Sequence, residues 1–292
     1  MEQNTLAPYN EQTGGHEDTL FMVDDGKILL KLYPNTSQEL GNYEKFNAEW
    51  HHYSLYTPHF YGTQGIDGKT FLKLENLTYG FTSPCVVDIK IGLRPFAPDA
   101  SESKQRVQTK KFNATTGCSL GLRLIAMKRY EPLQKLNINY PKSFGIEITT
   151  KERLKAALRL FFSYSTEKLD SEILHQPQCS SYQESNADNF PMHSVFHQET
   201  VKQVLIKVEQ LRDFFEKTPK PQLNFYSSSL LIVYEGNQIE SQDHLPEPKV
   251  KMIDFQHVFE RIPDTQAGKE EDGYVFGLQN LSSILQELLN KQ

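Results

Sequence analysis

Two hairpins near the N-terminus constrain the fold more than any other feature of the sequence. In the first, residues 20–23 and 28–33 are apolar runs that flank Asp25-Gly26; in the second, the alternating run 70–75 follows Asp67-Gly68. Asp-Gly favours the tight turn of a hairpin because glycine adopts a positive φ without steric cost. The chain is therefore predicted to begin with antiparallel strands.

A helical pattern lies between the two hairpins. Within residues 37–53, apolar side chains recur every three or four positions, at Leu40, Tyr43, Phe46 and Trp50. The order strand, strand, helix, strand, strand predicts an α+β lobe built on an antiparallel sheet. We place this N-lobe at residues 17–77, after a loose polar tail at 1–16.

Residues 78–292 are predicted to form a second, larger lobe. Strands are expected at 85–92, 122–130, 226–234 and 249–255, and helices at 101–109, 150–164, 195–217 and 273–289. The segment 176–191 is rich in Ser, Asn and Gln and is expected to be a loop, to which we assign no role.

The distribution of charge points to a small anionic ligand. The whole chain has a net charge of −6, which argues against a long nucleic acid as partner. Residues 101–111, in contrast, carry +3 (four cations minus one acid), and Lys104, Gln108 and Lys111 share one face of the predicted helix. A solvated basic face is the alternative explanation. The four cations of this basic helix are Lys104, Arg106, Lys110 and Lys111.

Other ligand classes find no support. No apolar run reaches the ~18–20 residues of a membrane span, and the three cysteines lack the CxxC spacing of a zinc site. We expect no membrane segment and no disulfide framework.

Five polar residues stand where phosphoryl-transfer chemistry would need them. Asp254 ends an apolar strand, a rigid position for a carboxylate that holds Mg²⁺. Lys31 interrupts an apolar run after a hairpin, and Asp88 and Lys90 share one face of a strand. His257 follows Asp254 by three residues. Each has an ordinary alternative: a turn-capping Asp, a solvent-facing Lys, a local salt bridge or an exposed His.

Four motifs in order resemble the inositol polyphosphate kinase family. Residues 84–92 (PCVVDIKIG) fit its PxxxDxKxG signature. The others are Ser228-Ser229-Leu230-Leu231, Ile253-Asp254-Phe255 and Asp272-Gly273-Tyr274…Gly277-Leu278, which is similar to the family's C-terminal DxGYxxGL segment. The resemblance implies a reduced protein-kinase-like fold, with an antiparallel N-lobe, an α/β C-lobe and ATP between them.

The resemblance also implies roles for single residues. Lys31 would contact the nucleotide phosphates, Glu75 and Leu77 would form the hinge that holds adenine, and Asp88 would contact the ribose. Asp254 would be the Mg²⁺ ligand, supported by Ser228 or Ser229, and would act in catalysis with Lys90. His257 would lie on the substrate side.

The substrate is expected to be a highly phosphorylated inositol. Gly92-Leu93-Arg94 and residues 119–123 resemble the inositol hexakisphosphate kinases, which make a diphosphoinositol pentakisphosphate. Ala126 departs from that branch, which leaves an inositol polyphosphate multikinase as the alternative and a non-catalytic sensor as a remote one. We expect a cytoplasmic or nuclear monomer that uses ATP. Substrate contacts are assigned to Lys90, Arg94, Lys104, Arg106, Gln108, Lys110, Lys111 and His257.

Overall fold

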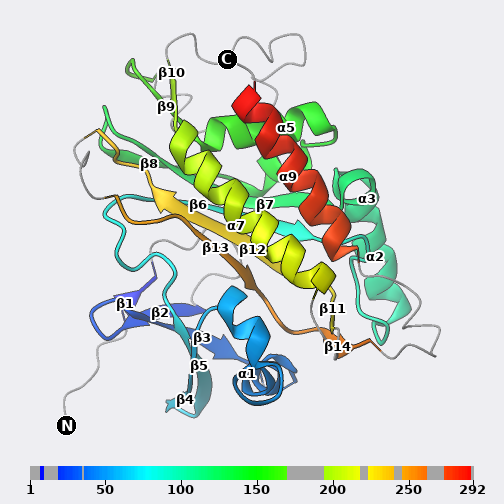
Figure 1. Cartoon of the computed structure of the whole chain (residues 1–292). Coiled ribbons are helices and arrows are strands. Elements are labelled where there is room, and N and C mark those ends of the chain that lie inside the picture. Colours follow the sequence, from blue (N-terminus) through cyan, green and yellow to red (C-terminus); the bar gives the residue numbers. More distant parts are fainter. Residues whose placement is uncertain are drawn as a thin grey trace.

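The computed structural model describes residues 7–9, 19–34, 36–169, 194–217, 223–239, 245–261 and 273–290 (Figure 1). The predicted loop 176–191 and the motif residue Asp272 lie outside these ranges. None of the helices in the described ranges combines the length and the apolar composition needed to cross a bilayer.

The N-lobe is an antiparallel sheet with the strand order β1-β2-β3-β5-β4. Its strands are β1 (Ala7–Pro8), β2 (Leu20–Val23), β3 (Ile28–Tyr33), β4 (Phe60–Ile66) and β5 (Lys69–Glu75). Both predicted hairpins are present, and Asp25, Gly26, Asp67 and Gly68 have positive φ in their turns. The predicted loose tail contains β1, which pairs with β2 in the register Ala7 to Met22.

The predicted helix 37–53 divides into α1 (Glu39–Ala48) and the 3₁₀ helix η1 (His51–Tyr56). The Ser37 hydroxyl accepts a hydrogen bond from the Glu39 amide at 3.1 Å near the start of α1. The apolar face of α1 reaches both lobes. Tyr43 stacks on Phe60 of β4 at 5.4 Å between ring centroids, and Phe46 packs edge-on against Phe255 at 4.9 Å.

The C-lobe contains a second antiparallel sheet, with the order β13-β12-β6-β7-β8. Its strands are β6 (Pro84–Ile91), β7 (Leu122–Glu131), β8 (Leu136–Tyr140), β12 (Ser229–Glu235) and β13 (Lys249–Ile253). One face is covered by α5 (Lys151–Phe161), α7 (Gln198–Lys217) and α9 (Tyr274–Asn290) (Figure 1). The α/β C-lobe of the prediction is thus an antiparallel sheet with helices on one side.

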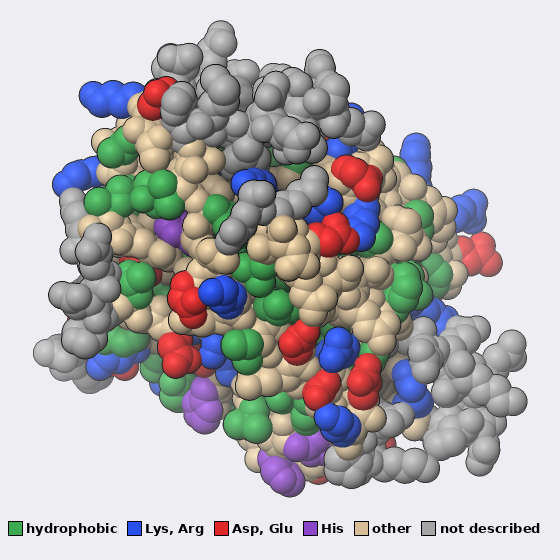
Figure 2. Space-filling model, turned by 45° about the horizontal axis from the view of Figure 1, so that its top comes forward, with side chains coloured by type: hydrophobic (Ala, Val, Ile, Leu, Met, Phe, Trp, Pro, Cys, Tyr) green, Lys and Arg blue, Asp and Glu red, His purple; other side chains and the backbone are tan. Residues whose placement is uncertain are grey.

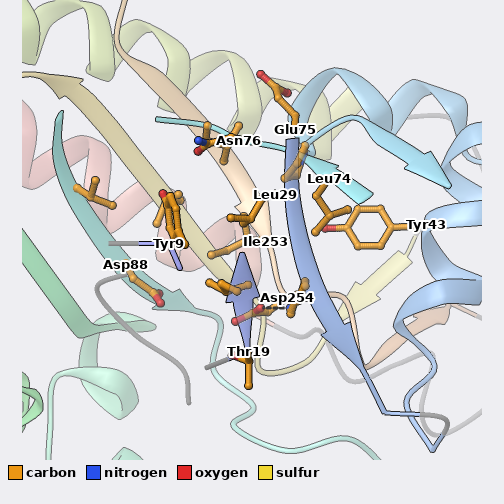
Figure 3. A pocket seen from close by; sticks show the side chains of 16 residues that line it. Tyr9, Thr19, Leu29, Tyr43, Leu74, Glu75, Asn76, Asp88, Ile253 and Asp254 are labelled. Carbon is orange, nitrogen blue, oxygen red and sulfur yellow. Dashed lines mark hydrogen bonds and ion pairs between the residues drawn. The ribbon is translucent and has the colours of Figure 1, made fainter. Parts of the chain in front are cut away.

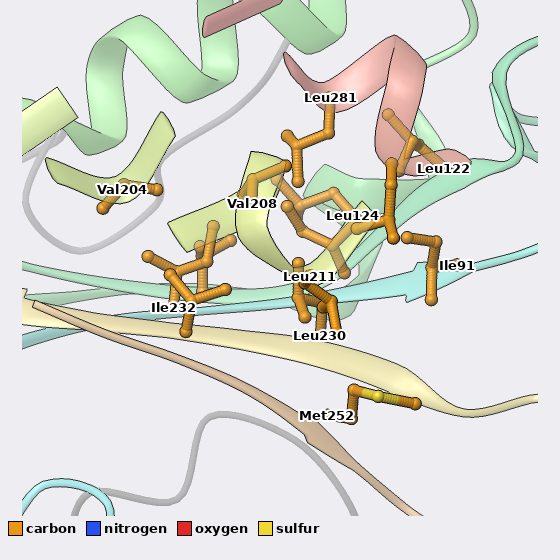
Figure 4. Packing of buried hydrophobic residues seen from close by; sticks show 14 of the residues in the cluster. Ile91, Leu122, Leu124, Val204, Val208, Leu211, Leu230, Ile232, Met252 and Leu281 are labelled. Carbon is orange, nitrogen blue, oxygen red and sulfur yellow. The ribbon is translucent and has the colours of Figure 1, made fainter. Parts of the chain in front are cut away.

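The main core lies between this sheet and its helices (Figure 4). Val204 and Val208 of α7, Leu281 of α9, and Leu230 and Ile232 of β12 are all 0% exposed. Burial on this scale fixes the register of β12 against β6, since a shift of one residue would turn the apolar side chains of β12 away from the core.

Shorter elements complete the lobe at its edges: α2 (Glu102–Asn113), α3 (Gly117–Leu120), α4 (Lys142–Ile146), β9 (Ser163–Ser165), β10 (Ser194–Phe196), β11 (Leu223–Phe225) and β14 (Val258–Glu260). The predicted strand 226–234 begins only at Ser229, because Ser227 adopts a φ of 57° in the turn between β11 and β12. The basic helix α2 extends past the predicted end at residue 109.

Candidate active site

A pocket lies between the two sheets (Figure 3). Its walls come from β3 through Leu29 and Lys31, from β6 through Asp88, and from the end of β13 through Asp254. The segment that joins the lobes adds Glu75, Asn76 and Leu77. All five residues that the resemblance assigned to the nucleotide therefore line one cavity: Lys31, Glu75, Leu77, Asp88 and Asp254.

Lys31 binds two carboxylates at the centre of the pocket. Its Nζ donates to Glu39 Oε1 at 2.8 Å and to Asp254 Oδ1 at 2.7 Å. The Glu39 side chain is 2% exposed, whereas that of Asp254 is 41% exposed. Burial works against the charge of Lys31, but Asp254 and then Glu39 outweigh it and raise the pKa of the lysine. Lys31 is therefore a fixed cation that joins β3, α1 and β13.

Sequence reasoning missed Glu39 and Asn42, which connect α1 to the site. Asn42 Nδ2 donates to the carbonyl of Phe255 at 2.7 Å, next to Asp254. Their spacing of three residues shows only that Glu39 and Asn42 share one face of the helix, beside its apolar positions. Their partners are 8 and 213 residues away, and no local pattern identifies them.

Asp254 is in a strained conformation at the mouth of the pocket. It follows the last residue of β13 with a φ of 65°, a region that Asp and Asn enter more readily than most residues. Burial opposes its ionisation, but the charges of Lys31 and Lys90 lower the pKa of the carboxyl. An ionised and half-exposed carboxylate suits Mg²⁺, which prefers one or two protein carboxylates together with nucleotide phosphates. In the described ranges no group of three or more His, Cys, Asp or Glu side chains is placed to hold a metal by itself.

Asp88 lies deeper in the pocket, on β6. It is 8% exposed, and burial raises the pKa of its carboxyl to about 6, with the charge of Asp254 adding to the effect and Lys90 opposing it. Ser228 and Ser229 are each 1% exposed, and neither forms part of the pocket wall. Of the two serines, Ser229 is the one paired with Ile253, the residue before Asp254.

Basic side chains from distant segments lie near Asp254 and His257: the charge of Lys90 acts on Asp254, and Lys104 contacts His257. Lys90 Nζ donates to the carbonyl of Ser227 at 2.6 Å, and the Arg94 guanidinium lies 5.4 Å from the centre of the Tyr226 ring. Lys104 Nζ approaches His257 Nε2 at 3.4 Å, although 153 residues separate them. Burial and then the charge of Lys104 lower the pKa of His257, which keeps the imidazole neutral at pH 7.

The two ends of the basic helix α2 contact different parts of the C-lobe. Lys104, near its start, faces His257. Lys110 and Lys111, near its end, line a second pocket, and Arg106 forms an exposed ion pair with Glu102 at 3.3 Å. A helix rises about 1.5 Å per residue, so the two ends of α2 meet different parts of the lobe. The assignment of these cations to the substrate stays a prediction.

The hinge is held by hydrogen bonds that the sequence did not reveal. Asn76 Nδ2 donates to the carbonyl of Gly26 at 2.7 Å, and Asn76 Oδ1 accepts from the amide of Thr78 at 3.0 Å. Tyr9, from the segment predicted to be a loose tail, lines the pocket, and its hydroxyl is 3.2 Å from Thr78 Oγ1.

Comparison with known proteins places this geometry in a family. The model of the family described as "Inositol polyphosphate kinase" matches residues 71–286, which is most of the chain. The chain belongs to the inositol polyphosphate kinase family. The match confirms the resemblance carried by the four motifs.

Relatives from two branches of the inositol polyphosphate kinase family are about equally similar to the chain. Human inositol hexakisphosphate kinase 3 is 28% identical over 75% of this chain and 51% of that protein. Inositol polyphosphate multikinase alpha of Arabidopsis thaliana is 28% identical over 92% of this chain and 89% of that protein. Human inositol polyphosphate multikinase is 27% identical over 80% of this chain and 52% of that protein. The chain thus spans about half the length of each of these two human relatives.

A solved structure confirms the two-lobe α+β fold. The inositol phosphate multikinase Ipk2 from S. cerevisiae, in complex with ADP and Mn²⁺, superposes with a TM-score of 0.67 at 22% identity. The match covers 91% of this chain and 100% of that one.

Proposed function

We propose that the chain transfers the γ-phosphoryl group of ATP to an inositol phosphate. The observation that carries the proposal is the contact of Lys31 with both Glu39 and Asp254, in a chain that also brings the cation Lys104 to the neutral His257, three residues after Asp254. A fixed lysine and a carboxylate for the metal meet the needs of the nucleotide. The neighbouring cations meet those of an anionic acceptor.

In this proposal the nucleotide lies in the pocket between the sheets. The adenine is held by the backbone of Glu75 and Leu77, and Asp88 accepts a hydrogen bond from the ribose. Lys31 neutralises phosphate charge, and Asp254, with support from Ser228 or Ser229, is the carboxylate that would hold Mg²⁺. A metal held there would supply positive charge against the nucleotide phosphates. The family membership, and the fact that Lys31, Glu75, Leu77, Asp88 and Asp254 line one pocket, support the assignment.

Lys90 is proposed to stabilise charge on the phosphoryl group as it moves to the acceptor. An acceptor phosphate is already an anion at neutral pH, so the step needs positioning more than a general base. His257, neutral and in contact with Lys104, is suited to donate or accept a hydrogen bond with the acceptor.

The preferred acceptor is proposed to be inositol hexakisphosphate, which would become a diphosphoinositol pentakisphosphate. The basic side chains near Asp254 and His257, and the face shared by Lys104, Gln108 and Lys111, favour a ligand with many phosphates. On the face shown in Figure 2, basic and acidic side chains are interspersed, which does not favour a nucleic acid there. An inositol polyphosphate multikinase is the second candidate, favoured by the near-complete match to the Arabidopsis multikinase. That the protein is a monomer stays a prediction.

Product analysis with γ-labelled ATP tests the function. Inositol phosphates with three to six phosphates are offered singly, and we expect label in a diphosphate product of the hexakisphosphate. Label only in products of the lower inositol phosphates would identify a multikinase. Binding of inositol phosphates without any label transfer would reject the enzyme and favour a sensor.

Nucleotide affinity is expected to depend on the ionisation of Asp88. Because the pKa of Asp88 is raised to about 6, its carboxylate is lost as the pH falls from 7 to 5, and the KM for ATP rises. Asp88→Asn should raise the KM about fivefold at pH 7.5, since a charge-assisted bond becomes a neutral one.

The measurement is the ratio of the KM for ATP of the variant to that of the wild type. Protonation of ATP itself affects both proteins equally and so cancels in this ratio. We expect the ratio to approach one at pH 5. A folded-state pKa above the unfolded value means that Asp88 contributes stability below its unfolded pKa and loses it as the pH rises through about 6. Asp88 therefore does not destabilise the fold at acid pH. A KM ratio that does not change with pH would contradict the assignment of Asp88 to the nucleotide.

A further inference from the structure

Phe255, which follows Asp254 in the chain, packs against one face of α1. It is 0% exposed. Its ring lies edge-on to Tyr43, at 5.3 Å between ring centroids, and edge-on to Phe46, at 4.9 Å. Tyr43 and Phe46 are three positions apart and so lie on the same side of the helix. These ring contacts hold the side chain of Phe255, and a second set of contacts holds its backbone.

Two polar side chains of α1 bind the backbone of Phe255. Asn42 Nδ2 donates a hydrogen bond to its carbonyl at 2.7 Å. Burial raises the pKa of Glu39, and a hydrogen bond with the backbone of Phe255 is among the interactions that oppose this rise. An ionised carboxylate only accepts hydrogen bonds, so the donor in that bond is the amide of Phe255. The helix therefore fixes both peptide groups of Phe255, the one before it through Glu39 and the one after it through Asn42.

Neither helix formation nor apolar packing explains an asparagine at position 42. Asn42 is 5% exposed, and asparagine is less favourable inside a helix than leucine or alanine. A buried amide costs free energy unless it is hydrogen-bonded. The partner of Asn42 is 213 residues away in the sequence, on the residue next to Asp254.

The conformation of Asp254 depends on the groups that hold its surroundings. Its φ of 65° lies in the left-handed region, which a residue with a Cβ atom keeps only where other contacts fix it. Lys31 Nζ holds the carboxylate at 2.7 Å, and the bonded backbone of Phe255 holds the chain that follows. Without the second contact, Asp254 is free to return to an ordinary φ, which turns its carboxylate away from the pocket.

We propose that Asn42 is a positioning residue for phosphoryl transfer. Through the carbonyl of Phe255, it keeps Asp254 in the conformation that presents the carboxylate to the metal and the nucleotide. The inference rests on the proposed function, in which Asp254 holds Mg²⁺. Asn42 is not among the residues that line the pocket between the sheets, so its effect on transfer is indirect.

The test is the affinity of the full chain for Mn²⁺ in the presence of ADP, measured by electron paramagnetic resonance. Asn42→Leu keeps the size of the side chain and suits the helix, but it removes the donor. We expect it to weaken Mn²⁺ binding about tenfold and to raise the Mg²⁺ concentration that gives half the maximal transfer rate by a similar factor. A purely structural role would lower the melting temperature and leave the metal affinity of the folded protein unchanged.

Asn47 offers a matched control on the same helix. Its Nδ2 also donates to a backbone carbonyl, that of Phe60 at 3.2 Å, but this bond leads to β4 and not to Asp254. Asn47→Leu should bind Mn²⁺ like the wild type. If Asn42→Leu fails to fold in a thermal melt, Asn42→Ala removes the same donor without adding bulk and should show the same loss of affinity.

Asp254→Asn separates this inference from the proposed function. If Asp254→Asn loses Mn²⁺ while the folded Asn42 variants bind it like Asn47→Leu, the positioning role is overturned and the metal site stands. If Asp254→Asn binds Mn²⁺ like the wild type, Asp254 is not the metal ligand, and the proposed metal site and the positioning role are both wrong.

Discussion

Asp254→Asn is expected to reduce phosphoryl transfer by more than about 100-fold while the inositol phosphate still binds. In the proposed mechanism Asp254 acts through its negative charge, because this carboxylate would hold Mg²⁺ beside the nucleotide phosphates. Asparagine keeps the shape and accepts the hydrogen bond from Lys31 Nζ, which now spans 2.7 Å. It also tolerates the φ of 65°, so the loss should come from chemistry and not from unfolding.

A matched control exists in the same chain. Asp67 also has a positive φ, of 50°, and lies in the exposed turn between β4 and β5. Asp67→Asn should leave transfer unchanged. Initial rates at saturating ATP and titration calorimetry with the inositol phosphate are the measurements. An Asp254→Asn variant that keeps a tenth or more of the wild-type rate would remove Asp254 from the metal site.

The local features of the fold were predictable from the sequence. Both Asp-Gly hairpins are where the turn chemistry placed them, and the helical segment between them is present as α1 followed by η1. The pairing of Asp88 and Lys90 on one strand, with Val87 and Ile89 fully buried on the other face, follows from the alternation of a strand.

The long-range features were not predictable from local patterns. Lys31 meets Asp254 across 223 residues and Lys104 meets His257 across 153. Only the order of the family motifs suggested that such residues gather. Glu39 was missed because an acid in the first turn of a helix is usually explained by the helix dipole. The different surroundings of the two ends of α2 were not predicted, because helical periodicity shows which residues share a face and not what each end of the helix contacts.

The other large effect is expected from Lys31→Met. The substitution leaves Glu39, whose side chain is 2% exposed, without its cation. A buried charge that loses its partner destabilises the fold, here by on the order of 3 kcal/mol at neutral pH. Transfer should fall by more than about 100-fold as well, since nucleotide phosphates lose their fixed cation. The loss of activity alone would not tell whether Lys31 acts on the nucleotide or only holds the fold together.

The double variant Lys31→Met with Glu39→Gln separates the two roles. A neutral glutamine needs no cation, so the unfolding free energy should recover most of the loss while transfer stays abolished. The single variant should also gain stability as the pH falls. Burial raises the pKa of Glu39 and Lys31 no longer opposes it; a raised folded-state pKa gives stability below the unfolded pKa that is lost as the pH rises. Chemical denaturation at pH 5 and 8 measures this, with Lys69→Met as the control for an exposed lysine. If the double variant regains transfer together with stability, Lys31 serves only to neutralise Glu39, and its proposed contact with the nucleotide is wrong.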